Sequence, residues 1–218
     1  MIIEDPWQLN LGARPIGASE VSFRVWAPFA QTVAVQTNAT HSVPFPLEKH
    51  DSGYLQANIA GCGPGTRYQY VLDGEKNRPD PASRSQPDGV HNASEVVAIE
   101  GFPWTDQQWK GMPLKHLILY ELHAGTFTHD GTFDAIIPLL DYLAEEVGIT
   151  AIELMPIAQF PGTRNWGYDG VYPFAPHNSF GGGQGLKQLV DACHARNLAV
   201  ILDVVYNHLG PEGNYLGD

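Results

Sequence analysis

Short runs in which apolar and polar residues alternate recur through the first hundred residues of the chain. They cover residues 21–26, 33–35 and 68–72, and the turn signal Asp73-Gly74 follows the last of them. A period of two is typical of strands that bury one face, and frequent Pro and Gly between runs favours short strands joined by turns. The pattern predicts an immunoglobulin-like antiparallel β-sandwich over residues 1–100, with its last strand at 95–99.

The pattern changes after Gly101. Residues 117–120 form a continuous apolar run, which predicts a strand buried on both faces. A helical period follows from Thr132 to Gly148, and Pro138 inside it marks a point where the helix restarts or kinks. The apolar positions expected to share one face of this helix are Ile136, Leu139, Leu140, Leu143 and Val147.

Two further strands and a helix complete the second half. Residues 149–155 and 198–205 are the expected strands, and an apolar stripe over 186–193 predicts a helix that ends near Asn197. Strands that alternate with helices predict a parallel α/β architecture.

Composition narrows the function classes. The 218 residues carry a net charge of −12, and 43% are hydrophobic, which is ample for a buried core. This composition excludes a disordered, collagen-like or disulfide-scaffold protein. The charge and the lack of a Lys/Arg cluster disfavour nucleic acid and other polyanions as partners, whereas a neutral polar substrate is compatible.

The sequence also predicts a compartment. The first ten residues contain Glu4 and Asp5 and lack the basic and apolar regions of a secretory signal, and no stretch is apolar enough to span a membrane. Cys62 and Cys193 fall in the two different halves of the chain, so we expect no disulfide between them and a cytoplasmic location.

Polar residues gather where the three expected parallel strands end. Glu121 and His123 close the first strand, Glu153 lies in the second, and Asp203 and His208 lie at and just beyond the end of the third. Active-site groups of parallel α/β folds lie at these carboxyl ends. The sequence therefore predicts a polar cavity there, with a functional role favoured for Asp203 and His208 and structural ion pairs with Arg or His favoured for Glu121 and Glu153.

Aromatic residues fill the long segment between the second strand and the second helix, residues 158–184. Aromatic rings cover the apolar faces of sugars, so this segment at an acidic sheet end suits a carbohydrate, with Tyr168 the best candidate for stacking. Some of these rings are also expected to form a small core beneath the loop. No phosphate-binding, zinc or serine-hydrolase motif is present, so we expect no cofactor and no metal. The aromatic residues are Trp166, Tyr168, Tyr172, Phe174 and Phe180.

Several segments resemble the α-amylase family, glycoside hydrolase family 13. Asp203-Val204-Val205-Tyr206-Asn207-His208 resembles its first conserved region. Phe23-Arg24-Val25-Trp26-Ala27-Pro28 is similar to the opening strand of the carbohydrate-binding-module-like sandwich that precedes the barrel in branching, debranching and trehalose-releasing members. Asp169-Gly170 is similar to the trehalose-releasing members, because branching enzymes have Gln and debranching enzymes Asn at the first position. Residues 80–84, 120–127 and 155–162 agree with the same members.

The resemblance implies a retaining glycosidase that cleaves the α-1,4 bond next to the terminal trehalose of maltooligosyltrehalose, with two carboxylates about 5–5.5 Å apart. It implies that Tyr168 stacks on the sugar before that bond, that His208 bonds its hydroxyls and that Asp203 supports the subsite. It implies no metal, although Asn207 matches a calcium ligand in some amylases. The expected substrate-binding residues are Tyr168, Asp203, His208, Trp166 and His123.

The resemblance also implies that this chain lacks the catalytic residues. In the family the nucleophile, the acid/base and the transition-state stabiliser follow the fourth, fifth and seventh strands of a (β/α)₈ barrel, so we expect them beyond Asp218. We expect a sandwich over 1–100, a linker over 101–116 and the first three barrel strands over 117–218. Three strands do not close a barrel, and the open edges predict self-association.

Two other functions remain open from the sequence. The chain could be part of a branching enzyme, which transfers glycosyl groups in the same fold. It could also be a non-catalytic glucan-binding module in which Trp7 and Trp26 are sugar platforms.

Overall fold

The computed structural model describes residues 10–39 and 43–218. The chain divides into two compact units, which we name the sandwich unit, Met1–Glu100 with Tyr215–Asp218, and the α/β unit, Gly101–Asn214. Each unit has its own hydrophobic core. In the part of the chain that the structure describes, no helix has the length and apolar character needed to cross a membrane.

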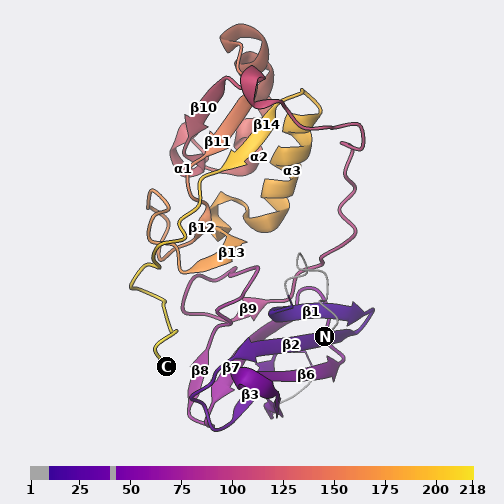
Figure 1. The fold of residues 1–218 in the computed structure, drawn as a ribbon, viewed down its shortest axis with the longest axis vertical. Coiled ribbons are helices and arrows are strands. Elements are labelled where there is room, and N and C mark those ends of the chain that lie inside the picture. Colours follow the sequence, from indigo (N-terminus) through magenta and orange to yellow (C-terminus); the bar gives the residue numbers. More distant parts are fainter. Residues whose placement is uncertain (1–9, 40–42) are drawn as a thin grey trace. The chain divides into compact units, whose positions relative to one another are not determined.

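The sandwich unit contains two antiparallel sheets, as the alternating runs predict (Figure 1). The first has the order β1 (Gly12–Gly17), β2 (Glu20–Trp26), β6 (Tyr54–Ala60) and β5 (Glu48–Lys49), with a short turn of helix, η1 (Asp51–Gly53), before β6. The second has the order β4 (Phe45–Pro46), β3 (Val33–Thr37), β7 (Arg67–Leu72) and β8 (Lys76–Arg78), with β9 (Ser94–Glu95) also paired to β7.

The core of the sandwich unit confirms the period of two. Alternate residues of β2 are buried, while Trp26 at its end is 54% exposed. Asp73 and Gly74 both adopt positive φ in the tight β7–β8 turn, as their sequence predicts. The last strand expected at 95–99 is wrong in extent, because β9 ends at Glu95 and Ile99 is half exposed. The partner strand β7 begins at Arg67. Beyond β9, the pairing therefore continues only through one backbone hydrogen bond each with Thr66 and Gly65.

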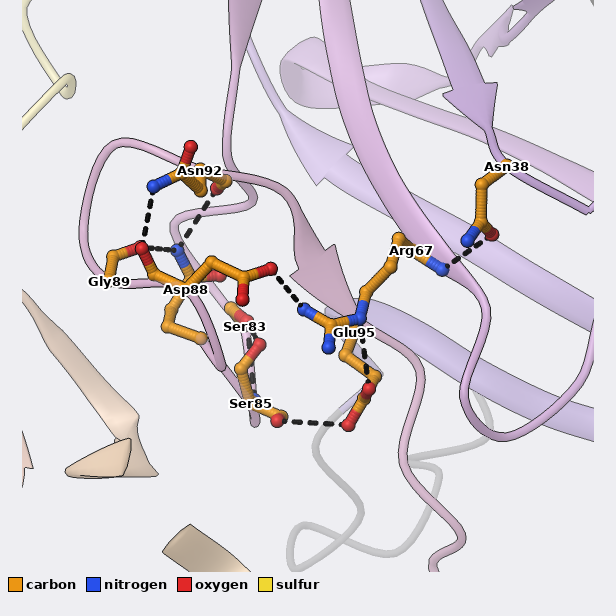
Figure 2. Close-up of polar contacts among 9 residues, drawn as sticks. Asn38, Arg67, Ser83, Ser85, Asp88, Gly89, Asn92 and Glu95 are labelled. Carbon is orange, nitrogen blue, oxygen red and sulfur yellow. Dashed lines mark hydrogen bonds and ion pairs between the residues drawn. The ribbon is translucent and has the colours of Figure 1, made fainter. Parts of the chain in front are cut away.

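Arg67 anchors the turn-rich segment that follows β8. Its guanidinium lies between Asp88, at 2.7 Å, and Glu95, at 3.0 Å (Figure 2). Glu95 also accepts a hydrogen bond from the Ser85 hydroxyl at 3.2 Å, and Asn92 donates to the Asp88 carbonyl at 2.6 Å. A partly exposed ion pair alone contributes about 0–1 kcal/mol. The segment is therefore held against the sheet by the connected network rather than by one pair.

Asp80 lies at the start of that segment and is fully buried. Its carboxylate accepts hydrogen bonds from the Tyr68 hydroxyl at 2.6 Å and from the Ala82 N–H at 2.8 Å. Burial, opposed by these hydrogen bonds and by the charge of Arg84, raises the pKa of Asp80 to about 6. A protonatable carboxyl is thus built into the core of the sandwich unit.

We expect Asp80→Asn to remove a pH dependence from the stability of this unit. Because the folded pKa is about 6 and the ordinary value is 3.8, the folded state holds a proton that the unfolded state releases. The contribution of Asp80 is therefore full below the ordinary value and decreases by about 3 kcal/mol as the pH rises through the folded pKa. Hydrogen exchange of the β7 amides, corrected for intrinsic exchange rates, measures the difference in unfolding free energy between about pH 4 and about pH 7. Equal pH slopes in wild type and variant would contradict the assignment.

The α/β unit is built on a parallel three-stranded sheet (Figure 1). Its order is β10 (Leu119–Leu122), β11 (Ala151–Leu154) and β14 (Ala199–Leu202), and Glu121 pairs with Glu153 in register. An antiparallel hairpin of β12 (Ala158–Gln159) and β13 (Tyr172–Pro176) follows β11. The helical segments are η2 (Leu114–His116), α1 (Ala124–Phe127), α2 (Phe133–Ile136), η3 (Ile137–Leu139), η4 (Tyr142–Val147), η5 (Asn178–Phe180) and α3 (Gly182–His194).

The helix expected from Thr132 is confirmed in position but not in continuity. Thr132 caps α2 by accepting the Ala135 N–H, and Gly148 ends η4 with a φ of 79°. Between them the chain passes through a 3₁₀ turn at Pro138 and then a π-helical turn, because proline has no N–H to donate to the preceding turn. Leu139 and Val147 are partly exposed, so the predicted apolar face is only partly buried. The second helix, α3, ends at His194, and the turn that follows it reaches Asn197, whose φ of 57° is the left-handed conformation expected near the helix end.

The prediction that residues 117–120 are buried on both faces is wrong. Within the described residues, the hydrophobic core of the unit packs α2 and α3 against one face of the sheet. Side chains on and beside the outer strands remain 36–57% exposed. They include Ile118, Leu119, Tyr120, Leu202 and Val204.

His177 is buried beneath the β12–β13 hairpin. Its ring lies 3.7 Å from that of Phe160, its Nε2–H donates to the Gly162 carbonyl at 3.2 Å, and its Nδ1 accepts the Ser179 N–H at 3.1 Å. Burial lowers the pKa of His177 to about 4. The imidazole is therefore neutral, because both ring nitrogens have partners only in that form.

We expect His177→Gln to remove an acid sensitivity of the α/β unit. The folded pKa of about 4 lies below the ordinary 6.5, so the unfolded state binds the extra proton. The stability contributed by neutral His177 decreases as the pH falls through this window, by up to about 3 kcal/mol. Hydrogen exchange of α3 amides in wild type and variant measures this difference. A variant that loses stability in acid as steeply as wild type would show that another group is responsible.

Candidate functional site

The loop of residues 165–170 contacts the chain at or near the carboxyl ends of all three parallel strands. It is hydrogen-bonded to His123 after β10 and to Asp203 and His208 after β14, and its Gly167 packs closely against Pro156 after β11. In a parallel sheet these ends lie at one edge, which is why residues far apart in sequence converge here. We name residues 165–170 the site loop.

Tyr168 is held by two of the predicted site residues. Its hydroxyl donates to the Asp203 carboxylate at 3.0 Å, and its carbonyl accepts the His208 Nε2–H at 2.8 Å. The hydrogen bond to Asp203 is the main cause that raises the pKa of Tyr168, and the negative charges of Glu121 and Glu153 add to it. Tyr168 remains 39% exposed, so its ring is fixed at the hydroxyl end and open to a ligand.

His123 supports the same loop from the first strand. Its Nε2–H donates to the Asn165 carbonyl at 2.8 Å, while Nδ1 accepts from the Thr126 hydroxyl at 3.2 Å. The Phe180 ring meets His123 edge-on, with ring centroids 5.5 Å apart. These contacts make His123 a support of the loop, and they use both of its nitrogens.

Two glycines allow the close packing of the site loop. Gly167 has a φ of +94°, and a Cβ there would lie 1.9 Å from the Pro156 carbonyl oxygen. Gly210 lies against Asp169, where a Cβ would be 2.2 Å from the Asp169 carbonyl oxygen, and its N–H donates to the Gly170 carbonyl at 3.1 Å. Any side chain at either position would push the loop away from the sheet end.

The aromatic segment divides into core and surface. Tyr172 and Phe180 are buried, but Phe180 belongs to the main hydrophobic core of the α/β unit rather than to a separate core beneath the loop. Trp166 is 74% exposed and Phe174 43% exposed, so Trp166 and Tyr168 are the rings of the site loop available to a ligand.

The acidic residues of the sheet end are not used in structural ion pairs. Among the ion pairs of the described residues, none involves Glu121 or Glu153, and both act on Tyr168 through their charge. In the described ranges, no cluster of three or more His, Cys, Asp or Glu is arranged to hold a metal ion. Asn207, which matches a calcium ligand of some amylases, has its side-chain oxygen Oδ1 at 3.1 Å from Nδ1 of His208.

Asn165 and Gly210 were not predicted from the sequence as parts of the site. Asn165 precedes the recognisable Trp-Gly-Tyr-Asp segment and carries no signal of its own, since asparagine is common in loops. Gly210 follows Asn207-His208, where a glycine is equally common. Only the contacts show what each does.

The fold defines a two-unit protein in which a β-sandwich precedes an α/β unit, and two family models match these units. The family model described as the alpha amylase catalytic domain matches residues 80–218, and that of carbohydrate-binding module 48, the isoamylase N-terminal domain, matches residues 10–87. This chain belongs to the α-amylase family.

The chain is also similar in sequence to individual members of this family. The chain is 48% identical over 196 residues to a malto-oligosyltrehalose trehalohydrolase of Saccharolobus solfataricus, and 47% identical over 213 residues to that of Deinococcus radiodurans. These alignments cover 90% and 97% of the chain, which spans about a third of each relative, 34%. A solved structure described as an alpha amylase of Salmonella typhimurium superposes with a TM-score of 0.90 at 44% identity, over 95% of this chain and 35% of that one.

Proposed function

We propose that this chain is the amino-terminal part of a retaining glycoside hydrolase that releases trehalose from maltooligosyltrehalose. The observation that carries the proposal is the fixed Tyr168–Asp203–His208 cluster, in a chain that is 42–48% identical to seven matched trehalohydrolase sequences. Trehalose biosynthesis from α-glucan is the metabolic role that this reaction implies.

In this proposal the site loop forms the subsite for the sugar before the scissile bond. The open face of Tyr168 stacks on the apolar face of that sugar, and Trp166 extends the aromatic surface beside it. Asp203 fixes the Tyr168 hydroxyl, and His208 and Asp203 lie where sugar hydroxyls need polar partners. His123 acts one step further away, by holding the loop.

We further propose that none of Glu121, Glu153 and Asp203 is the nucleophile or the acid/base. A retaining enzyme needs two carboxylates about 5–5.5 Å apart on either side of the glycosidic bond. Asp203 is engaged with Tyr168, and the proposed catalytic carboxylates belong to the part of the relatives that this chain does not match. We therefore expect the chain alone to be inactive.

Two assays test the reaction. The chain alone should release no trehalose from maltooligosyltrehalose, and release at an enzymatic rate would show that the catalytic carboxylates are misplaced. A graft of residues 1–218 in place of the matched third of the Deinococcus radiodurans enzyme should restore trehalose release. The same graft carrying Tyr168→Ala is the matched control and should be strongly impaired.

A branching enzyme is the second candidate, because the chain is 33% identical over 227 residues to a 1,4-alpha-glucan branching enzyme of Xanthomonas campestris. The product discriminates the two: a graft that forms α-1,6 branches in amylose, without trehalose release, would favour branching.

A glucan-binding role of the sandwich unit is the third candidate. The match to carbohydrate-binding module 48 and the exposed Trp26 ring support it, while Trp7 lies outside the described residues. The Trp26 Nε1–H donates to the Ser52 carbonyl at 2.9 Å, which fixes the ring in place. Trp26→Ala is therefore the variant that separates this candidate from the site loop.

We propose self-association of the chain through its parallel sheet. In the described α/β unit, β10 and β14 each have one neighbouring strand, and apolar side chains beside them are exposed. Exposed strand edges and apolar patches favour pairing with a second copy. Light scattering should give a mass that rises with concentration, and Leu119→Lys should reduce it.

The proposed setting is the cytoplasm, and the proposed domain limits are 1–100 and 117–218 with a linker between. The two cysteines are buried and unpaired, which supports a reducing compartment.

A further inference from the structure

Asn165 makes three contacts that no other residue of the site loop combines. Its carbonyl accepts the His123 Nε2–H at 2.8 Å. Its side-chain oxygen accepts the Gly167 N–H at 2.8 Å, and its side-chain nitrogen donates to the Asp169 carboxylate at 2.6 Å. The partners of these two side-chain bonds, Gly167 and Asp169, flank Tyr168 in the sequence, so the bonds close the turn that presents the Tyr168 ring.

We propose that Asn165 is the positioning residue of the site loop and that its pairing with Asp169 sets the orientation of Tyr168. In this proposal Asn165 acts through Tyr168 rather than on a ligand. Its effect on sugar binding rests on the proposed function, but its effect on loop geometry does not.

The chemistry of the contacts explains why an amide is needed at position 165. One side-chain atom must accept from a backbone N–H and the other must donate to a carboxylate. Asparagine supplies both at the reach of a single short side chain, whereas aspartate supplies two acceptors and no donor. The bond to the ionised Asp169 is also the stronger kind, because its acceptor is charged.

This requirement gives a pattern of variants that a packing role does not give. Asn165→Asp places two carboxylates face to face and should open the turn. Asp169→Asn keeps an acceptor for the Asn165 amide and should have little effect. The double variant, Asn165→Asp with Asp169→Asn, restores one donor and one acceptor in reversed order and should therefore rescue the turn.

The experiment measures two properties of the full chain in wild type and these three variants. Long-range ¹H–¹⁵N NMR of the His123 ring reports loop geometry, since its Nε2–H is protected by the Asn165 carbonyl. Calorimetric titration with maltoheptaose reports sugar binding. Asn77→Asp is the matched control, because it makes the same substitution on β8 in the sandwich unit.

We expect Asn165→Asp to lose the protected His123 signal and to weaken maltoheptaose binding about tenfold or more, as for loss of a hydrogen bond to a charged group. Asp169→Asn and the double variant should keep the protected His123 signal, and Asn77→Asp should keep both the signal and a maltoheptaose affinity within about threefold of wild type. The proposal is overturned if the double variant is as impaired as Asn165→Asp, or if Asn165→Asp keeps the His123 signal.

The two readouts separate this inference from the proposed function. If wild type does not bind maltoheptaose but the His123 signal follows the predicted pattern, the proposed function fails and the positioning role stands. If wild type binds and the signal does not follow the pattern, the positioning role fails alone.

Discussion

Gly167→Ala should lower the free energy of unfolding of the α/β unit by about 2–4 kcal/mol and abolish maltoheptaose binding. Two effects combine at this position. The φ of +94° is a conformation that side chains rarely adopt, and the new Cβ would lie 1.9 Å from the Pro156 carbonyl oxygen. The site loop must leave the sheet end to relieve the contact, which breaks the bonds from Tyr168 to Asp203 and His208.

Gly183→Ala is the matched control for this substitution. Gly183 lies in α3, its φ is not positive, and a Cβ there meets nothing within 4 Å. Alanine in a helix is favoured over glycine by about 0.5–1 kcal/mol, so this variant should be as stable as wild type or more so. Urea unfolding and calorimetry measure both variants. A Gly167→Ala protein with wild-type stability and binding would show that the loop does not depend on this close contact.

Phe180→Ala should destabilise the α/β unit by about 3–5 kcal/mol, because it removes a buried ring from the centre of the core beneath the site. Phe180 is 2% exposed, and its ring centroid lies 4.8 Å from His177, 5.5 Å from His123 and 5.8 Å from Phe160. The loss should also free the His123 ring, so the loop should loosen before the unit unfolds.

Phe174→Ala provides the comparison, since it removes the same ring from a side chain that is 43% exposed on β13. Partial exposure leaves less apolar area to lose, and we expect less than about 1.5 kcal/mol. Thermal unfolding of both variants decides the point. Equal losses for the two would mean that Phe180 is not the central core ring.

The fold of the sandwich unit could be predicted because the residues within each strand and turn determine its local structure. The alternation through Val21, Phe23 and Val25 matches the burial of β2, and Asp73-Gly74 contains a turn conformation that few other pairs adopt. The turn through Asn197 that follows α3 is predictable for the same reason, since the residue type fits the left-handed backbone there.

The predictions that were wrong concern features that depend on what packs beside an element rather than on the residues within it. The apolar run at 117–120 is the same sequence whether one face or two are covered, so its exposure could not be predicted. The π-helical turn after Pro138 depends on how the chain continues past a missing N–H. At the candidate site, the sequence could predict that Tyr168, Asp203 and His208 lie together, but the role proposed for Asn165 follows only from its contacts.

The most direct test of whether the site loop holds an α-glucan is to measure maltoheptaose binding by the wild-type chain and by two variants, Tyr168→Ala and Trp26→Ala. We expect titration calorimetry to detect weak binding to the wild type, unchanged in Trp26→Ala and lost in Tyr168→Ala. Binding that persists in Tyr168→Ala but disappears in Trp26→Ala, or a wild-type chain that binds no glucan, would contradict the proposed site.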